Sequence, residues 1–144
     1  MKDQQSDLTN IYRNMYRQRL VENPASTTME YWEHHFTTMV SSGLDWINGE
    51  VLDLGCGTGE IDIWLARNKP SIHISAVDIA SEALELANKH LSREPKRIRD
   101  RVSFHESMAE SLPFPDSSFD ACIISHTLEH IIDPRPMFIE LYRV

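Results

Sequence analysis

The sequence predicts an α/β fold, in which a parallel β-sheet carries helices on both faces. Three observations predict it. From residue 50 onward, short apolar segments alternate with segments of helical periodicity. The apolar segments lack polar alternation, as expected for strands buried on both faces. Their order is strand, helix, strand, helix, strand, strand, helix, which is typical of sheets covered by helices on each side.

The first 49 residues are expected to form a helical cap of two helices. Apolar residues recur at helical spacing in the first of them: Leu8, Ile11, Tyr12, Met15 and Tyr16. Asn23 and Pro24 break this pattern. A capping box formed by Thr27 and Glu30 predicts the start of a second helix, and Gly43 its end.

The remaining elements follow from residue 50. Strands are expected at residues 51–54, 72–77, 102–105 and 121–125, and helices at 61–68 and 81–91. Asp133 is a suitable N-cap and Pro134 a suitable first helical residue, so a last helix is expected from there. The basic run Arg93 to Arg101 is interpreted as a solvated linker. In such sheets ligands bind beyond the carboxyl ends of the strands.

Composition narrows the possible functions. A chain of 144 residues with 41% hydrophobic and 25% charged residues is typical of one globular domain. The formal net charge of −8 argues against a nucleic-acid partner. We find no apolar run long enough for a membrane span and no secretory signal. Cys56 and Cys122 are interpreted as free thiols, so a cytoplasmic protein is expected.

A glycine loop follows the first strand. Gly55, Gly57 and Gly59 allow a tight turn and the close approach of a ligand. Asp78 ends the second strand, where a carboxylate can accept both hydroxyls of a ribose. The G-x-G-x-G spacing disfavours a nicotinamide dinucleotide, whose sites prefer G-x-G-x-x-G. Acidic residues flank the loop, which favours a cationic nucleoside that carries an amino acid. The alternative is a purely structural turn.

Three stretches resemble the class I S-adenosylmethionine-dependent methyltransferases. VLDLGCGTGE resembles their first motif and AVDIAS their second. SMAESLPFPDSSFDACIISHTLEHIIDP resembles the region through the fourth strand in the small-molecule branch. The resemblance covers about residues 45–144. It implies a Rossmann-like domain over residues 50–144, preceded by the helical cap at residues 1–49, and S-adenosyl-L-methionine as cofactor.

The resemblance also implies a role for individual residues. Asp53 and the loop would hold the methionine part of the cofactor, the loop being Gly55, Cys56, Gly57, Thr58 and Gly59. Asp78 would hold the ribose, Ile79 would pack on the adenine, and Met108 and Ala109 would border it. Ser125 and His126 would lie near the methyl group. The family often has an acidic residue where Met108 stands, and methionine cannot accept the bond from the adenine amino group.

A second departure concerns length. The family's sheet has seven strands, whereas this sequence ends at Val144, so strands five to seven are expected to be missing. The fourth strand would then be an apolar sheet edge. A fragment, a truncated product and a half completed by another chain all fit this observation.

His126, Glu129 and His130 form an H-x-x-E-H pattern with three open interpretations. A histidine near the methyl group could act as a general base for the acceptor. The group could bind a divalent metal, although we expect none. The residues could also be structural or line the substrate pocket.

The sequence therefore predicts methyl transfer to an O, N or C nucleophile of a small molecule by in-line displacement. The alternative is a non-catalytic or truncated cofactor-binding half that acts with a partner chain. A homodimer or a completing chain along the edge of the fourth strand would suit that alternative.

Overall fold

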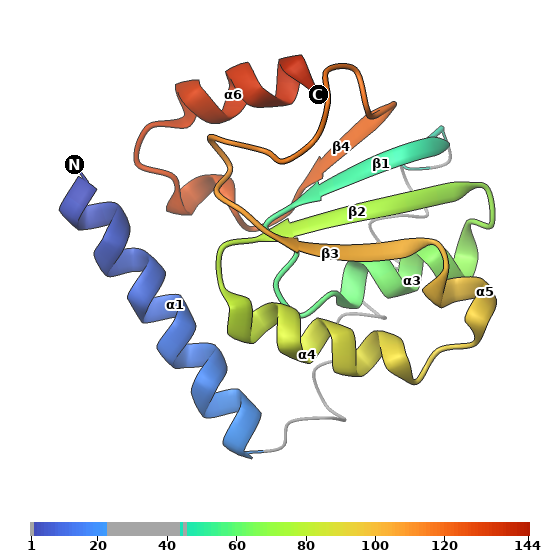
Figure 1. Cartoon of the computed structure of the whole chain (residues 1–144), viewed down its shortest axis with the longest axis horizontal. Helices are drawn as coiled ribbons and strands as arrows, with labels where there is room; N and C mark the ends of the chain where they lie inside the picture. Colours follow the sequence, from blue (N-terminus) through green and yellow to red (C-terminus); the bar gives the residue numbers. More distant parts are fainter. Residues whose placement is uncertain (1, 23–43, 45) are drawn as a thin grey trace.

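The computed structural model describes residues 2–22, 44 and 46–144. Its centre is a four-stranded parallel sheet with the strand order β3-β2-β1-β4 (Figure 1). The strands are β1 (Gly49–Leu54), β2 (Ile72–Asp78), β3 (Val102–Glu106) and β4 (Ala121–Ile124). The expected parallel Rossmann-like sheet is thereby confirmed.

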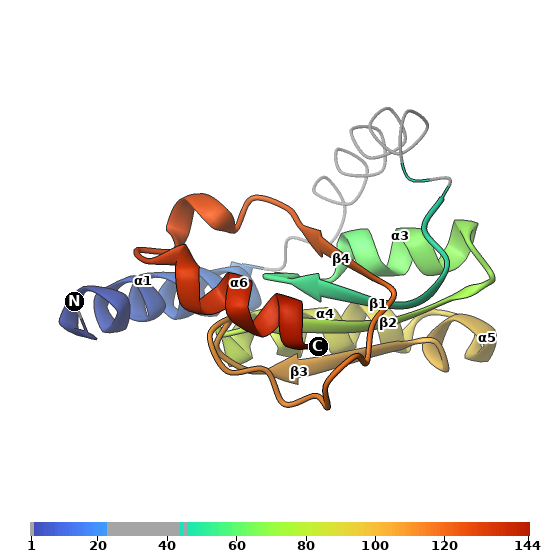
Figure 2. The same ribbon diagram turned by 90° about the horizontal axis from the view of Figure 1, so that it is seen from above.

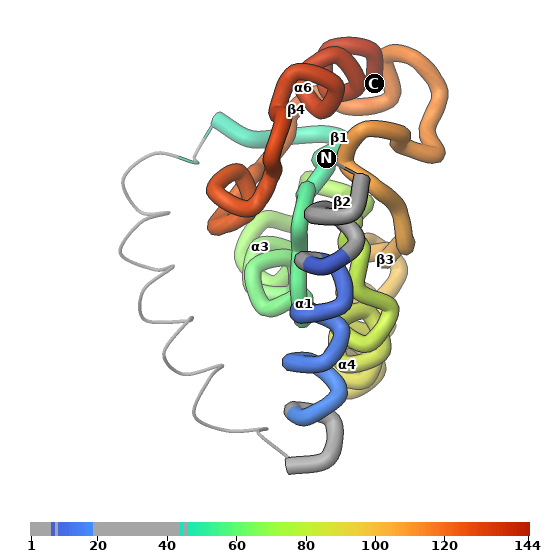
Figure 3. Tube along the Cα trace, turned by 90° about the vertical axis from the view of Figure 1, so that its left-hand side faces the viewer, coloured from blue at the N-terminus to red at the C-terminus, as the bar shows by residue number. Residues whose placement is uncertain are grey.

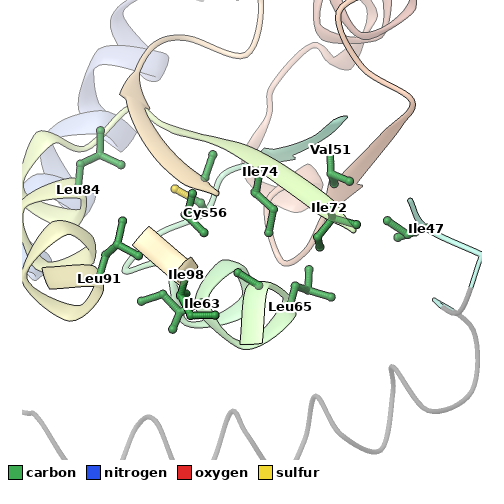
Figure 4. Close-up of a cluster of buried hydrophobic side chains, with 13 residues drawn as sticks. Ile47, Val51, Cys56, Ile63, Leu65, Ile72, Ile74, Leu84, Leu91 and Ile98 are labelled. Carbon is green, nitrogen blue, oxygen red and sulfur yellow. The ribbon is translucent and has the colours of Figure 1, made fainter. Parts of the chain in front are cut away.

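One face of the sheet is covered by three helices. These are α3 (Glu60–Asn68), α4 (Ser81–Ser92) and α5 (Lys96–Arg99). Ile72 and Ile74 of β2 pack against Ile63 and Leu65 of α3 in a cluster that is nearly inaccessible to solvent (Figure 4). Burial of such side chains is worth about 1.5–3 kcal/mol each, so this cluster contributes much of the stability of the sheet.

The opposite face carries α6 (Pro134–Arg143), as Figure 2 shows. Met137 of α6 is fully buried in a second cluster with Leu52 and Leu54 of β1 and Val77 of β2. Two clusters form because successive strand residues point to opposite faces. Asp133 caps α6, accepting a hydrogen bond from the backbone N–H of Arg135, as the sequence predicts.

The first helix, α1 (Lys2–Glu22), runs beside α4 (Figures 1 and 3). Arg17 forms an ion pair with Glu82 of α4 at 2.7 Å, and Arg13 one with Glu106 at the end of β3 at 2.9 Å. The second helix expected in this region, from Thr27 to Gly43, lies outside the described residues.

The basic run expected to be a solvated linker contains structure of its own. Its residues 96–99 form α5, and Ile98 is buried in the first core cluster. The Arg101 guanidinium donates to the backbone carbonyls of Lys69 and Ile72 and also to that of Ala66. Most side chains of the run are exposed to solvent, as predicted. The run is more than a linker, because Ile98 anchors it in the core and Arg101 caps backbone carbonyls of neighbouring segments. The expected strand at 121–125 ends one residue earlier, at Ile124.

Candidate functional site

The carboxyl ends of β1, β2 and β4 open into a cavity of about 250 Å³. Two groups of residues line it. The sheet ends and the loops behind them contribute Leu54, Gly55, Val77, Asp78, Ile79, Ser107, Ala109, Glu110, His126, Thr127, His130 and Ile131. Helix α1 contributes Thr9, Tyr12 and Tyr16 from the other side. The cavity therefore lies where the topology of a parallel sheet predicts a ligand site.

The glycine loop is fastened to the end of β2. The backbone N–H groups of Gly55 and Cys56 both donate to the carbonyl of Val77, at 2.7 and 3.0 Å. The Asp78 carboxylate accepts from the N–H of Gly57 and from that of Ala80, both at 2.8 Å. Burial raises the pKa of Asp78, and these backbone donors oppose the shift. Each oxygen keeps a further lone pair, so Asp78 can still accept from a ligand hydroxyl.

Two glycines of the loop are required by its geometry. Gly55 has φ +82°, and a Cβ there would lie 2.1 Å from the hydroxyl oxygen of Thr127. Gly59 has φ +74°, and a Cβ there would lie 2.6 Å from Cζ of Phe104. Both positive φ values disfavour other residues. The loop can thus approach β3 and the segment after β4 closely only because these positions lack side chains.

Asp53 lies beneath the loop and not in the cavity wall. It is 1% exposed, and no hydrogen-bond donor among the described residues reaches its carboxylate. Its neighbour is Asp62 of α3, which is fully buried and lacks a donor in the same way. Burial is the main cause that raises the pKa of Asp53, to about 7, and the pKa of Asp62 is raised well above its usual range.

The segment after β4 forms the remaining wall. His126 has φ +53°, which is uncommon for a residue other than glycine. The short 3₁₀ helix η1 (Leu128–His130) follows, and Glu129 lies 3.7 Å from Nδ1 of His126 and 3.9 Å from Nε2 of His130. The ring of His130 also contacts Tyr12 of α1 edge-on, with centroids 5.2 Å apart. In the part of the chain that the structure describes, no three His, Cys, Asp or Glu side chains are grouped to hold a metal ion.

Comparison with protein families agrees with this geometry. The model of the methyltransferase domain family matches residues 52–144. The chain belongs to this methyltransferase domain family. The match covers both the glycine loop and the segment after β4. It confirms the family expected from the sequence.

The curated relatives support the same family assignment. The bifunctional biotin biosynthesis protein BioHC of Teredinibacter turnerae is 38% identical over 98 residues, which cover 65% of this chain and 17% of the relative. The demethylmenaquinone methyltransferase of Clavibacter sepedonicus is 38% identical over 94 residues, 65% of this chain and 36% of the relative. The chain thus matches well under half of the length of each of these relatives.

Solved structures of methyltransferases share the fold. A putative S-adenosyl-L-methionine-dependent methyltransferase from Methanococcus maripaludis superposes with a TM-score of 0.70 at 19% identity, covering 94% of this chain and 57% of that one. The glycopeptide N-methyltransferase MtfA in complex with S-adenosylmethionine gives 0.60 at 19% identity, covering 75% and 46%. At this identity the likeness shows the fold alone.

The structure of this methyltransferase domain brings several predicted site residues together. Gly55, Asp78, Ile79, Ala109 and His126 line one cavity, and His130 lies in the same wall. Others lie elsewhere. Asp53 and Cys56 are buried, and Gly57, Thr58 and Gly59 continue the loop behind the cavity. Met108 is 46% exposed, and neither it nor Ser125 is among the lining residues.

Some lining residues were not singled out from the sequence as site residues. Glu110 stands two residues after Met108 and supplies a carboxylate to the cavity wall, whereas Met108, where the family often has an acidic residue, does not line the cavity. Thr127 contacts Gly55, and its hydroxyl donates to the carbonyl of Gly55 at 3.4 Å. Tyr12 and Tyr16 follow the apolar periodicity of the first helix in the sequence, and in the structure both line the cavity. Only for Glu110 did the sequence carry a signal, namely an acid within the loop after β3.

Proposed function

We propose that this chain is the cofactor-binding part of an S-adenosylmethionine-dependent methyltransferase. It transfers the methyl group to an O, N or C nucleophile of a small-molecule acceptor by in-line displacement. The observation that carries this proposal is the hydrogen-bonded junction of the glycine loop and Asp78 at the mouth of the cavity. Membership of the methyltransferase domain family and the small-molecule enzymes among the relatives support it.

The residues present fit this cofactor. A Cβ at Gly57 would lie 3.1 Å from the hydroxyl oxygen of Tyr16, so the glycine keeps this part of the loop free of a side chain next to α1. Asp78 keeps acceptor capacity for the ribose hydroxyls, and Ile79 offers an apolar surface for the adenine. Glu110 can accept a hydrogen bond at the same end. When bound, the cofactor supplies a methyl group activated by a positively charged sulfur, so this chain needs no nucleophile of its own.

The wall after β4 is proposed to face the acceptor. Alignment of the attacking atom with the methyl carbon supplies much of the acceleration in such a reaction. His126 and His130 lie in this wall and share Glu129 as a neighbour, so either can take a proton from the acceptor. Ser125 is proposed to lie near the methyl group. A purely structural role of the two histidines is the competing interpretation.

The domain organisation is proposed as a cap at residues 1–49 and a cofactor domain at residues 50–144. The alternative function is that of a non-catalytic half that acts with a partner chain. It is favoured by the position of β4 at the sheet edge and by two exposed residues of α6, Ile139 at 69% and Tyr142 at 95%. A second copy or a completing chain would pair along β4.

We place the protein in the cytoplasm. Cys56 and Cys122 are both unpaired thiols, as in a reducing compartment. None of the helices in the described part of the chain combines the length and the apolar character that a bilayer crossing requires.

The deciding experiment is a calorimetric titration of the 144-residue chain with S-adenosylhomocysteine, with Asp78→Ala as the matched variant. We expect saturable binding that the variant loses. Absence of binding by the folded protein would overturn the catalytic proposal and favour the non-catalytic half that acts with a partner chain. Binding of NAD in place of S-adenosylhomocysteine would instead indicate an oxidoreductase. Light scattering on the same sample separates a monomer from a dimer.

A further inference from the structure

Two buried aspartates form a pair beneath the glycine loop. Asp53 is 1% exposed and Asp62 is 0% exposed, yet no donor among the described residues reaches any of their four carboxyl oxygens. The two side chains interact with each other across the interface between β1 and α3. Two ionised carboxylates in contact and out of water repel each other strongly, whereas one proton between them makes a hydrogen bond.

The surroundings of the pair are acidic or neutral. Glu60 on α3 and Asp78 on β2 act on it electrostatically, and both disfavour a second negative charge. Burial raises the pKa values of the Cys56 thiol in the loop and of the Cys122 thiol on β4, and the negative charge of Asp53 adds to both shifts. From α4, His90 reaches the loop but is bonded to the carbonyl of Thr58 at 3.0 Å. Among the described residues, no cation neutralises the pair.

We propose that Asp62 is a positioning residue for Asp53, and that the two carboxyl groups share one proton at neutral pH. The shared proton fixes the Asp53 side chain below the loop and limits the pair to a single negative charge. The inference has two parts. The first, the shared proton, concerns the protein alone. The second, that the ordered Asp53 supports the methionine end of the cofactor site, rests on the proposed function.

The shared proton makes the free energy of unfolding depend on pH. The pKa values of both groups are raised in the folded protein, so the folded state holds protons that the unfolded state has released. The stability that the pair contributes is then fully present below the unfolded pKa of about 4, and it is lost as the pH rises through about 7 and beyond. An asparagine at position 62 can donate to Asp53 without titrating, so Asp62→Asn removes much of this dependence.

The test measures Tm between pH 6 and 9 for the 144-residue wild-type chain and for Asp62→Asn. Asp100→Asn is the control, since Asp100 is exposed and pairs with Lys96 at the surface. We expect the wild-type and control Tm to fall with pH and that of Asp62→Asn to fall less, so that it is the highest at pH 9. Equal pH slopes in the wild type and Asp62→Asn would overturn the proposal.

An infrared spectrum of the wild type at pH 7.5 is independent of how the variants fold. A carboxylic acid C=O band that shifts in D₂O is expected, and its absence overturns the shared proton. Binding of S-adenosylhomocysteine then tests the second part: Asp62→Asn retains affinity, and Asp62→Leu loses about tenfold. If the pH slopes differ as expected but wild type binds no S-adenosylhomocysteine, the proposed function fails and the proton pair stands.

Discussion

The backbone N–H of Gly57 donates a 2.8 Å hydrogen bond to Oδ2 of Asp78, a residue on the neighbouring strand's end. The other oxygen of Asp78 accepts from the N–H of Ala80, at the start of α4. One carboxylate thus holds the glycine loop and the first turn of a helix in a fixed relation. This relation shapes the cavity before any ligand binds, which lowers the ordering cost of binding.

Replacement of Asp78 by asparagine should loosen this junction. An amide offers one acceptor oxygen in place of two, so one of the two backbone N–H groups loses its partner. We expect faster hydrogen exchange at Gly57 or Ala80 and about tenfold weaker binding of S-adenosylhomocysteine, or about 1.4 kcal/mol. Asp100→Asn is the matched surface control. Unchanged exchange and affinity in Asp78→Asn would contradict this role.

Alanine at position 59 should destabilise the fold. It places a side chain at φ +74° and brings a Cβ to 2.6 Å from the ring of Phe104. We expect a loss of about 2 kcal/mol in the free energy of unfolding, measured by urea denaturation. Phe104→Leu removes the ring that the new Cβ would meet. The double variant Gly59→Ala/Phe104→Leu should therefore lose less free energy of unfolding than the sum of the losses in the two single variants. Simple additivity of the two changes would show that the ring contact is not the cause.

Two residues of α1 provide a test of the cavity wall. Tyr16 lines the cavity, whereas Ile11 is 61% exposed and does not line it. Tyr16→Ala is therefore expected to weaken binding of S-adenosylhomocysteine several-fold, because an aromatic surface is lost. Ile11→Ala should leave the affinity unchanged. Equal effects of both changes would indicate that α1 acts only through general stability.

Glu140 joins α6 to the loop between β3 and β4. Glu140 accepts from Arg143 at 2.8 Å and from the backbone N–H of Leu112 at 2.8 Å. These donors lower the pKa of Glu140 to about 2. A lowered pKa in the folded state stabilises the protein above the unfolded pKa of about 4.3, and the contribution is lost as the pH falls toward 2.

Glu140→Gln should accordingly lower Tm at pH 7, by an amount that shrinks between pH 4.5 and pH 3. Thermal unfolding at several pH values measures the difference from the wild type. Glu85→Gln is the control, since Glu85 forms an exposed pair with Lys89 on α4. A difference that stays constant over this range would rule out the ionised form of Glu140 as the source.

The histidines can be separated by their effects on binding and turnover. If either is a general base, His126→Ala or His130→Ala should leave S-adenosylhomocysteine affinity within about threefold, while methylation of an accepted substrate falls by about 10²-fold or more. The pH–rate profile of that variant should also lose its acidic limb. Loss of binding and turnover together would favour the structural interpretation.

The sequence by itself determined the parallel sheet, the glycine loop and its partner Asp78. These features are local, since each depends on apolar periodicity, on glycine spacing and on the residue that ends a strand. The cap of α6 at Asp133 was predictable for the same reason. The short helix α5 was not predicted, because a single apolar residue, Ile98, gives no periodicity. Its role is visible only in the core cluster into which it packs.

Only the tertiary structure decided which side chains meet. Asp53 and Asp62 belong to different elements, and their contact follows from the way α3 packs on β1. Tyr16 reaches the loop because ion pairs hold α1 beside α4 and β3. Thr127 and Gly55 meet because β1 and β4, distant in sequence, are adjacent in the sheet. Such long-range contacts depend on the packing of elements and on charges in different elements. Neither produces a periodic pattern in the sequence, so the sequence alone does not predict them.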